Sequence, residues 1–443
     1  MSKLGKLNLF DLTMIVIGLV IGLGIFRTSR DAANAALNPS IFFAAWIVGG
    51  IVAVFGALTY AEIGSRYPVT GGYYKVFAYA YHPSIAFAIN CVILISNAAS
   101  LAGVALIGSE YISQVIFSVD PSPFIKSLIA MSAILAFYGI NMMGLKISSR
   151  VLNILMMIKI GMLVIIIAAI FVPGLHHHEV HAYHAVQNSF WATVLSFGVA
   201  LKATSFTYGG YQQTINFGDE ILNPRRNIPR GVIIGIIVII VLYLSVSYSY
   251  YSVIGFENLK DAKGIAAIVA QKMFGEPGRY ASSILLFIAV LAYVDVILLS
   301  NPRVMYAMSE DGILPRSFKK KDEKKDVLTV SLTVFASVCI VVLFFADTFD
   351  KILSFTIFLD SIGMATSAAT IFVLRPRTKH LDAAGTYSMK FYPAMPLIFV
   401  LTYIFVGTMI AITFPQYALV GTIVFLAFLA LYFLIKRTRK PAQ

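Results

Sequence analysis

Long apolar segments recur along the whole chain, and each is long enough to form a helix that crosses a lipid bilayer. Such a helix needs about 20 mostly apolar residues, because the hydrocarbon core of a bilayer is about 30 Å thick. The polar stretches between the segments are too short for a separate soluble domain. The pattern predicts twelve spans, at residues 10–29, 41–65, 84–116, 125–145, 150–172, 189–217, 231–254, 281–308, 328–346, 352–374, 393–413 and 417–436.

The composition supports a membrane protein and excludes several other classes. Of the 443 residues, 59% are hydrophobic and 12% are charged, whereas about a quarter of the residues in an average soluble domain are charged. A disordered chain, a disulfide-rich secreted domain and a typical cytosolic enzyme do not fit these values. We therefore predict one all-α, polytopic membrane domain over residues 1–443, surrounded by the lipid bilayer.

Positive charge predicts how the chain lies in the membrane. The formal net charge is +13, and the Lys and Arg residues of multi-pass membrane proteins gather in cytoplasmic loops. Most of the basic residues fall on one face when both termini are placed on the cytoplasmic side. We expect this orientation in the plasma (inner) membrane, and the charge requires no nucleic acid partner.

Two of the predicted spans contain clustered glycines near their centres. The first contains Gly18, Gly22 and Gly24, and the sixth contains the pair Gly209-Gly210. The spacing of Gly18 and Gly22 also suits close packing against a neighbouring helix. The alternative is an unwound turn, which is tolerated at membrane depth only where the freed backbone faces a cavity. Because the clusters lie five spans apart, they favour a transporter of inverted repeats, with spans 1 and 6 broken.

The predicted repeats cover residues 10–172 and 189–374, and residues 393–436 add two further helices. A broken helix exposes free N–H groups at the start of its second half, and these bind an anion such as a carboxylate. Free carbonyls at the end of the first half accept hydrogen bonds from an ammonium group. Two broken helices side by side therefore suit an amino acid, which has both groups on one carbon.

Four sequence motifs follow one another in a family-specific order. They are Gly18 to Phe26, Tyr60 to Gly64 with Gly71 to Tyr74, Phe206 to Tyr211 with Asp219 to Arg230, and Arg303 to Pro315. In this order they resemble the amino acid–polyamine–organocation superfamily of transporters, and within it the L-type amino acid transporter branch in a prokaryotic form. The resemblance implies a 5+5 inverted-repeat fold with broken helices 1 and 6, and amino acid exchange or uptake.

The resemblance also implies roles for the residues at the two breaks. The substrate carboxylate would bind backbone N–H groups of four residues: Ile21, Gly22, Leu23 and Gly24. Family members usually have Ser at the position of Leu23, so this chain lacks that hydroxyl. The substrate ammonium would bind the carbonyls of three residues: Ser205, Phe206 and Thr207. Phe206 matches the aromatic gate that closes the site from outside; the alternative is a packed aromatic side chain.

Lys159 lies in the middle of the fifth predicted span. A charged group at this depth costs several kcal/mol unless it is paired or faces a cavity. It resembles the fifth-helix lysine of sodium-independent family members, whose ammonium contacts carbonyls of helix 1 where sodium-coupled relatives hold a sodium ion. Two roles stay open for Lys159: a permanent surrogate cation, or a group that releases a proton and couples transport to protons.

Two further polar residues within spans are candidates for contact with the substrate side chain. Asp295 lies in the middle of the eighth span, where it either accepts hydrogen bonds from the substrate or pairs with Lys159 or Lys202. Asn97 lies in the third span. Polar groups in spans also bond across helices without touching a ligand, so both interpretations stay open.

The sequence lacks the motifs of several other functions. It has no G-x-x-x-x-G-K-[ST], H-E-x-x-H or G-x-S-x-G motif, so we expect no enzyme activity and no cofactor. Residues 119–124 contain no cysteine, whereas heteromeric members of the branch attach a glycoprotein there. We therefore expect no disulfide-linked heavy subunit. Five histidines lie within residues 173–188, and we interpret them as a solvated loop rather than a metal site.

The leading functional interpretation is a sodium-independent secondary transporter that exchanges neutral L-amino acids by alternating access. An alternative in the same fold is a proton-coupled importer of cationic amino acids or polyamines, which Asp295 motivates. A third is a membrane sensor that binds amino acids without transporting them. Stimulation of uptake by internal substrate favours exchange, whereas uptake that follows a pH gradient favours the importer.

Overall fold

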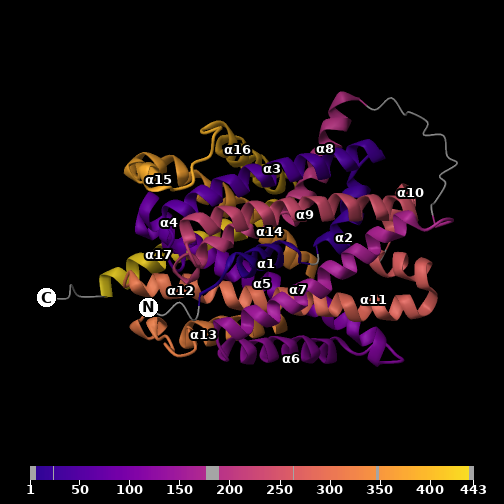
Figure 1. Cartoon of the computed structure of the whole chain (residues 1–443), viewed down its shortest axis with the longest axis horizontal. Helices are drawn as coiled ribbons and strands as arrows, with labels where there is room; N and C mark the ends of the chain where they lie inside the picture. The colour runs from indigo at the N-terminus through magenta and orange to yellow at the C-terminus, as the bar shows by residue number, and fades with distance from the viewer. Residues whose placement is uncertain (1–5, 23, 176–188, 263, 346–348, 439–443) are drawn as a thin grey trace.

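The fold is a bundle of helices that run roughly along one common axis (Figure 1). The computed structural model describes residues 6–22, 24–175, 189–262, 264–345 and 349–438. The α-helices are α1 Leu9–Val20, α2 Gly24–Ala35, α3 Pro39–Arg66, α4 Gly72–Ala80, α5 Pro83–Ile116, α6 Pro123–Met142, α7 Leu145–Ala168, α8 Phe190–Thr207, α9 Pro224–Ile254, α10 Phe256–Asp261, α11 Ile265–Ser300, α12 Pro302–Glu310, α13 Thr329–Phe345, α14 Phe349–Ala369, α15 Ile371–Arg377, α16 Ala394–Thr413 and α17 Pro415–Thr438. The 3₁₀ helices are η2 Ala169–Phe171, η3 Tyr211–Asn216, η4 Gly218–Glu220, η5 Arg316–Lys319 and η6 Lys379–Ala384.

Each of the twelve predicted segments overlaps a helix, and the all-α polytopic fold is confirmed. Within the described residues, nine helical stretches are long and apolar enough to cross a membrane, and the bent pair α1–α2 brings the number to ten. Helix α13 is apolar but shorter. The exact number of twelve spans stays a prediction.

Proline sets the start of several spans. Pro39, Pro83, Pro123 and Pro224 each occupy the first turn of a long helix, where a missing N–H costs nothing and the fixed φ suits a helix. Before Pro39, the Asn38 side chain accepts a hydrogen bond from the backbone N–H of Ile41. This cap satisfies one of the N–H groups that a helix start leaves free.

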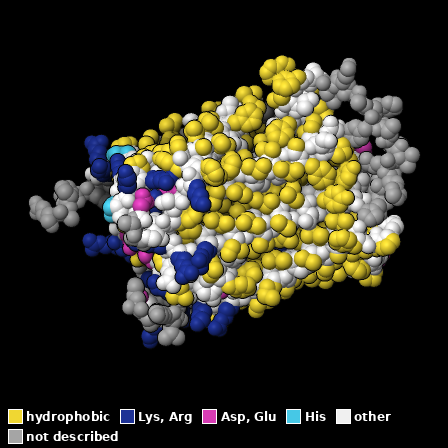
Figure 2. Space-filling model, turned by 45° about the horizontal axis from the view of Figure 1, so that its top comes forward, with side chains coloured by type: hydrophobic (Ala, Val, Ile, Leu, Met, Phe, Trp, Pro, Cys, Tyr) yellow, Lys and Arg dark blue, Asp and Glu magenta, His cyan; other side chains and the backbone are white. Residues whose placement is uncertain are grey.

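The outer surface separates into an apolar belt and a charged end. Figure 2 shows hydrophobic side chains over the flank of the bundle and Lys and Arg gathered at one end. In Figure 1 the same end contains both chain termini together with α4, α12 and α15. We call it the basic end. An apolar flank matches lipid, and a charged end matches the aqueous face of a membrane.

Both predicted breaks are present. The first span consists of α1 and α2, whose axes differ by 41° across the interruption. In the sixth, α8 ends at Thr207 and the chain continues as η3 from Tyr211. The predicted segment 189–217 is therefore not one continuous helix, because Gly210 adopts a φ of 118° that an α-helix does not contain.

An aromatic cluster holds the end of α8 against two long helices. The Tyr208 ring lies 5.8 Å from the Trp46 ring of α3 and 5.2 Å from the Tyr243 ring of α9. The Tyr208 hydroxyl also donates to the Trp46 carbonyl at 3.3 Å. These contacts fix the position at which the sixth span breaks.

Candidate functional site

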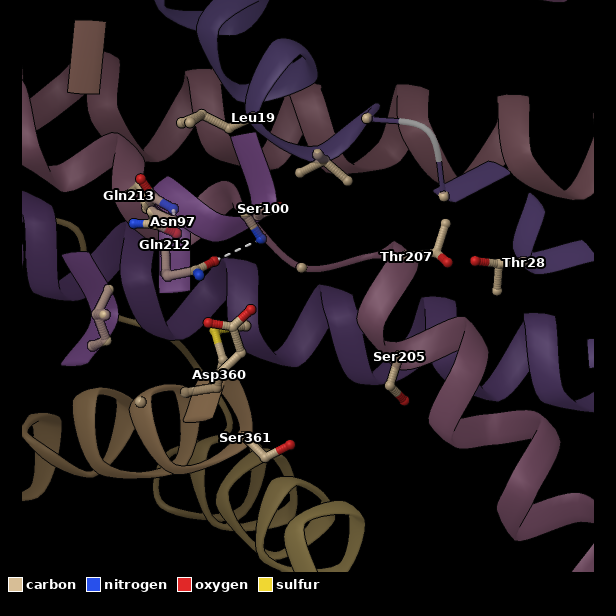
Figure 3. A pocket seen from close by; sticks show the side chains of 18 of the residues that line it. Leu19, Thr28, Asn97, Ser100, Ser205, Thr207, Gln212, Gln213, Asp360 and Ser361 are labelled. Carbon is tan, nitrogen blue, oxygen red and sulfur yellow. Dashed lines mark hydrogen bonds between the residues drawn. The ribbon is translucent and has the colours of Figure 1, made fainter. Parts of the chain in front are cut away.

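A polar cavity lies between the two breaks. Its wall comes from α1, α2, α4, α5, α8, η3 with the segment before it, α11, α14 and α16. Figure 3 shows Asn97, Gln212 and Gln213 grouped at one side of it and Thr28 and Thr207 at the other. Polar side chains within membrane spans are costly unless they face one another or a cavity, so their convergence makes this cavity the candidate functional site.

The two breaks touch each other directly, and glycine makes the contact possible. A Cβ atom on Gly24, at the start of α2, would lie 2.8 Å from Cγ2 of Thr207, at the end of α8. A Cβ on Gly210 would collide with the carbonyl of Leu19 near the end of α1. Both glycines are therefore required by close approach of the two unwound segments.

Two donors from other helices bind the carbonyls at the end of α1. The Lys159 ammonium of α7 is fully buried and donates to the carbonyl of Ile21 at 2.5 Å. The Tyr243 hydroxyl of α9 donates to the carbonyl of Val20 at 3.2 Å. Both carbonyls lie where the helix stops and their usual N–H partners are missing. The expected contact of Lys159 with the first span is present.

The second break combines a local hydrogen bond with contacts from other helices. The Gly210 N–H donates to the Gln212 side chain at 2.8 Å, as the dashed line in Figure 3 shows. The carbonyl of Ser205 accepts a hydrogen bond from the Tyr403 hydroxyl of α16 at 3.3 Å. The Ser205 hydroxyl is buried and has no partner among the described residues. It therefore has hydrogen-bonding capacity left for a ligand.

Several of the residues expected at the breaks line the cavity. Gly22, Gly24, Ser205 and Thr207 are part of its wall. Ile21 instead directs its carbonyl to Lys159. Two expected contributions lie outside what the structure describes: residue Leu23 and the side chain of Phe206. The gate at Phe206 therefore stays a prediction.

Asn97 lines the cavity as part of a buried amide network. Its Nδ2 donates to Oδ1 of Asn301 at 2.6 Å, and its Oδ1 accepts from Nε2 of Gln213 at 3.2 Å. Gln213 also belongs to the cavity wall. Asn97 therefore bonds across helices and also lines the cavity, and its contact with a substrate stays a prediction.

Asp295 is not part of the cavity wall. Contact with substrate was one of its two expected alternatives, and an ion pair with Lys159 or Lys202 was the other. Its Oδ1 accepts from Nδ2 of Asn141 at 2.7 Å and from Oγ of Ser148 at 3.0 Å. It is absent from the cavity wall, and no ion pair among the described residues joins it to Lys159 or Lys202. Instead, Lys202 lies 4.8 Å from the centre of the Phe414 ring. The side of α11 that carries Asp295 packs against α6 and α7, which is why this carboxyl group misses the site.

Two acidic residues lie in the cavity wall, Asp31 of α2 and Asp360 of α14, and Asp360 is the one within a long apolar segment. The sequence analysis missed it. Its signal was an aspartate within an otherwise apolar span, since such groups are rare at membrane depth and mark functional sites. Asp360 and Asp295 both met this criterion, and their sequence environments did not distinguish them. Tyr293 of α11 and Ser100 of α5 were missed as well; their hydroxyls lie 2.9 Å apart at the cavity.

Charged groups tie distant segments together at the basic end. Arg303 of α12 and Glu220 of η4 form a buried ion pair at 2.5 Å, and Lys75 of α4 pairs with Asp311 at 2.5 Å. Burial acts to lower the pKa of Lys75, but its contacts with Asp311 and Glu310 outweigh this effect and raise the pKa above its usual value. These pairs join segments up to 236 residues apart in sequence.

A metal or disulfide role has no support in the described residues. No group of three or more His, Cys, Asp or Glu there could hold a metal ion, and the five histidines of the 173–188 loop lie outside the described residues. Cys91 of α5 and Cys339 of α13 are free thiols.

A helical membrane protein with two broken spans around a polar cavity has the architecture of a secondary transporter. The chain belongs to the amino acid permease family, in the amino acid–polyamine–organocation superfamily, whose family model matches residues 7–441. Members of this family are transporters and not enzymes, so the chain is a multi-pass amino acid transporter of the membrane.

Named relatives agree with this assignment. The serine/threonine exchanger SteT of Bacillus subtilis is 27% identical over 433 residues, which cover 97% of this chain and 96% of SteT. The branched-chain amino acid permease BcaP of the same organism is 26% identical, with 95% and 92% covered. The Asc-type amino acid transporter 1 of Mus musculus is 22% identical, with 97% and 81% covered.

Proposed function

We propose that this protein is a sodium-independent secondary transporter that exchanges L-amino acids across the plasma (inner) membrane by alternating access. The observation that carries the proposal is the Lys159 ammonium, 2.5 Å from the carbonyl of Ile21 at the first break. A bound cation at this carbonyl stabilises the unwound end of α1. A cation fixed to the chain supplies that charge without sodium, so the resting site needs no co-transported metal ion.

The two breaks suit the two charged groups of an amino acid. The start of α2 at Gly24 supplies backbone N–H groups and the positive end of a helix dipole, which favour the substrate carboxylate. The carbonyls of residues 205–207, at the end of α8, suit the substrate ammonium. In this proposal Leu23 contributes backbone only, and Phe206 closes the site. The leading substrates are neutral amino acids, in line with the names of SteT and BcaP.

The two ends of the bundle differ in how tightly they are closed, which agrees with alternating access. The basic end is tied by the ion pairs Glu220–Arg303 and Lys75–Asp311, whereas the cavity extends along α2 to Arg27 and Thr28, towards the other end. We propose that the basic end is cytoplasmic, with both termini there, and that this conformation has the cytoplasmic gate closed. The two repeats, residues 10–172 and 189–374, would move relative to each other to open it.

Exchange by the purified protein in liposomes tests the proposal. Vesicles preloaded with unlabelled amino acids are compared with empty vesicles, without sodium and at equal pH on both sides. We expect uptake of radiolabelled amino acid in preloaded vesicles that exceeds uptake in empty ones at least several-fold. Uptake into empty vesicles that grows on external acidification would instead support the proton-coupled importer. Ligand binding without flux would support the sensor.

A further inference from the structure

The cavity contains a carboxylate that the two breaks do not explain. Asp360 of α14 lines it from the side opposite Gln212, and Figure 3 shows its carboxylate pointing across the cavity towards Gln212. On the assumption that the proposed amino acid transport is correct, we propose that Asp360 binds the side chain of the substrate and extends the substrate class to amino acids with a cationic side chain.

The surroundings of Asp360 leave its charge uncompensated. Its one hydrogen-bond donor among the described residues is the Ser96 hydroxyl of α5, 3.2 Å from Oδ1. None of the ion pairs in the described part of the chain includes it. A carboxylate at membrane depth is costly without a cation. A positively charged ligand group would supply that cation.

Three cationic residues of the spans and the cavity wall have other partners. The Lys159 ammonium donates to the carbonyl of Ile21, and Lys202 lies over the Phe414 ring. Arg27 lines the cavity from α2 and has a partner of its own. The missing partner of Asp360 is therefore expected from outside the chain.

The position of Asp360 favours the substrate side chain over its backbone groups. The breaks lie on α1–α2 and on α8, whereas Asp360 lies on α14, beside apolar wall residues such as Ile93, Met364 and Val406. An amino acid held by both breaks would lay its aliphatic stem along these residues. Its terminal ammonium or guanidinium would then form a charge-assisted hydrogen bond with the Asp360 carboxylate.

Asp295 provides a matched control for this site. Like Asp360, it is an aspartate within a span that accepts a hydrogen bond from a serine hydroxyl. Unlike Asp360, it has a second donor in Asn141 and lies outside the cavity wall. Removal of charge at the two positions therefore separates an effect on the substrate from a general effect of losing a buried carboxylate.

The test measures exchange of L-lysine and of L-leucine in proteoliposomes by the wild type, Asp360→Asn and Asp295→Asn. We expect the wild type to exchange both. Asp360→Asn should lower kcat/KM for lysine at least tenfold and change that for leucine less than threefold. Asp295→Asn should leave the lysine-to-leucine ratio as in the wild type. Asp360→Glu, which keeps the charge, should retain more lysine transport than Asp360→Asn.

Three outcomes would overturn the inference, and they are distinguishable. Exchange of leucine but not lysine by the wild type removes the cationic substrate class while keeping the proposed function. Equal loss of lysine and leucine transport in Asp360→Asn would mean that the carboxylate binds the α-ammonium group that both substrates share, or that it takes part in proton coupling. Failure of the wild type to exchange any amino acid rejects the proposed function itself. If Asp360→Asn does not fold, the melting temperature of the wild type is measured with lysine and with leucine. We expect lysine to raise it more than leucine does, and equal shifts would count against the inference.

Discussion

The two breaks have the same role in the cavity but are held by different forces. At the first, a buried ammonium from α7 and a phenol from α9 reach across to the carbonyls of Ile21 and Val20. At the second, the main local feature is steric: Gly210 has a φ of 118° and fits against the Leu19 carbonyl. Its N–H bonds to a side chain two residues further on.

The difference shows that unwinding a membrane helix creates two separate requirements. Backbone polar groups that lose their partners need new ones, because no water in the hydrocarbon core replaces them. The chain must also adopt torsion angles that are closed to residues with a side chain. New partners for backbone polar groups are the main feature of the first break, and unusual torsion angles are the main feature of the second. Charge changes should therefore damage the first, and size changes the second.

The largest effect is expected from Gly210→Ala at the second break. The positive φ costs about 1–3 kcal/mol for a residue with a side chain. Overpacking against the Leu19 backbone adds a further cost of about 1–3 kcal/mol. Thermal unfolding in detergent should show a clear loss of stability, with uptake nearly abolished.

The control for this substitution is Gly139→Ala in α6, where an added Cβ meets no atom within 4 Å. It should leave stability and uptake unchanged or slightly improved. A Gly210→Ala protein with the melting temperature and uptake of the wild type would show that the second break does not depend on glycine.

Lys159→Met should separate function from stability at the first break. It removes a charge-assisted hydrogen bond to Ile21, a kind that contributes about 1.5–3 kcal/mol, so exchange should fall roughly 10–100-fold. Met removes the cost of burying an ammonium but leaves the carbonyl of Ile21 without its donor. These two effects oppose each other, so the melting temperature should change much less than exchange does. Exchange and melting curves are measured on the same preparation.

Lys202→Met is the matched control for Lys159→Met. Lys202 is only partly buried and contacts the Phe414 ring rather than the break, so its loss should change exchange by less than about threefold, as for a typical exposed cation–π contact. Equal loss of exchange in both variants would mean that positive charge in general, and not the contact with Ile21, supports transport.

A smaller effect is expected for Tyr243→Phe. The Val20 carbonyl loses the hydroxyl but keeps the N–H of Gly22 at 2.8 Å. Loss of a neutral hydrogen bond costs about 0.5–1.5 kcal/mol, so kcat/KM should fall only a few-fold. If kcat/KM falls as much as in Lys159→Met, the two donors contribute equally, and the charge of Lys159 is then not what stabilises the first break.

The smallest effect is expected for Gln212→Met at the second break. The Gly210 N–H loses its acceptor, but it faces the cavity, where water replaces that acceptor at a net cost below about 1 kcal/mol. Stability should change little, and exchange should fall less than about threefold. A large loss of stability in Gln212→Met would show instead that the hydrogen bond to Gly210, and not the torsion angle of Gly210, holds the second break.

The sequence determined the fold class and the two breaks, and each of its twelve apolar segments overlaps a helix. Apolar segments of about 20 residues are visible in a single sequence because the bilayer imposes their length on each helix separately. Glycines such as Gly210 also stand out in a single sequence, because a glycine within a helix lowers helix stability at its own position. The sequence also predicts a functional role for Lys159, because one ammonium in an apolar span has few ways to be satisfied.

Only the tertiary structure decided which intramembrane aspartate faces the cavity. Asp295 and Asp360 both lie near the middle of a predicted span, 281–308 and 352–374, and hydropathy does not report the direction a side chain takes. Packing of α11 against α6 and α7 directs Asp295 to Asn141 and Ser148. The position of α14 beside the breaks places Asp360 in the cavity wall. Helices buried on most sides carry little periodic signal in their sequence, so their rotation is set by contacts between segments that are distant along the chain.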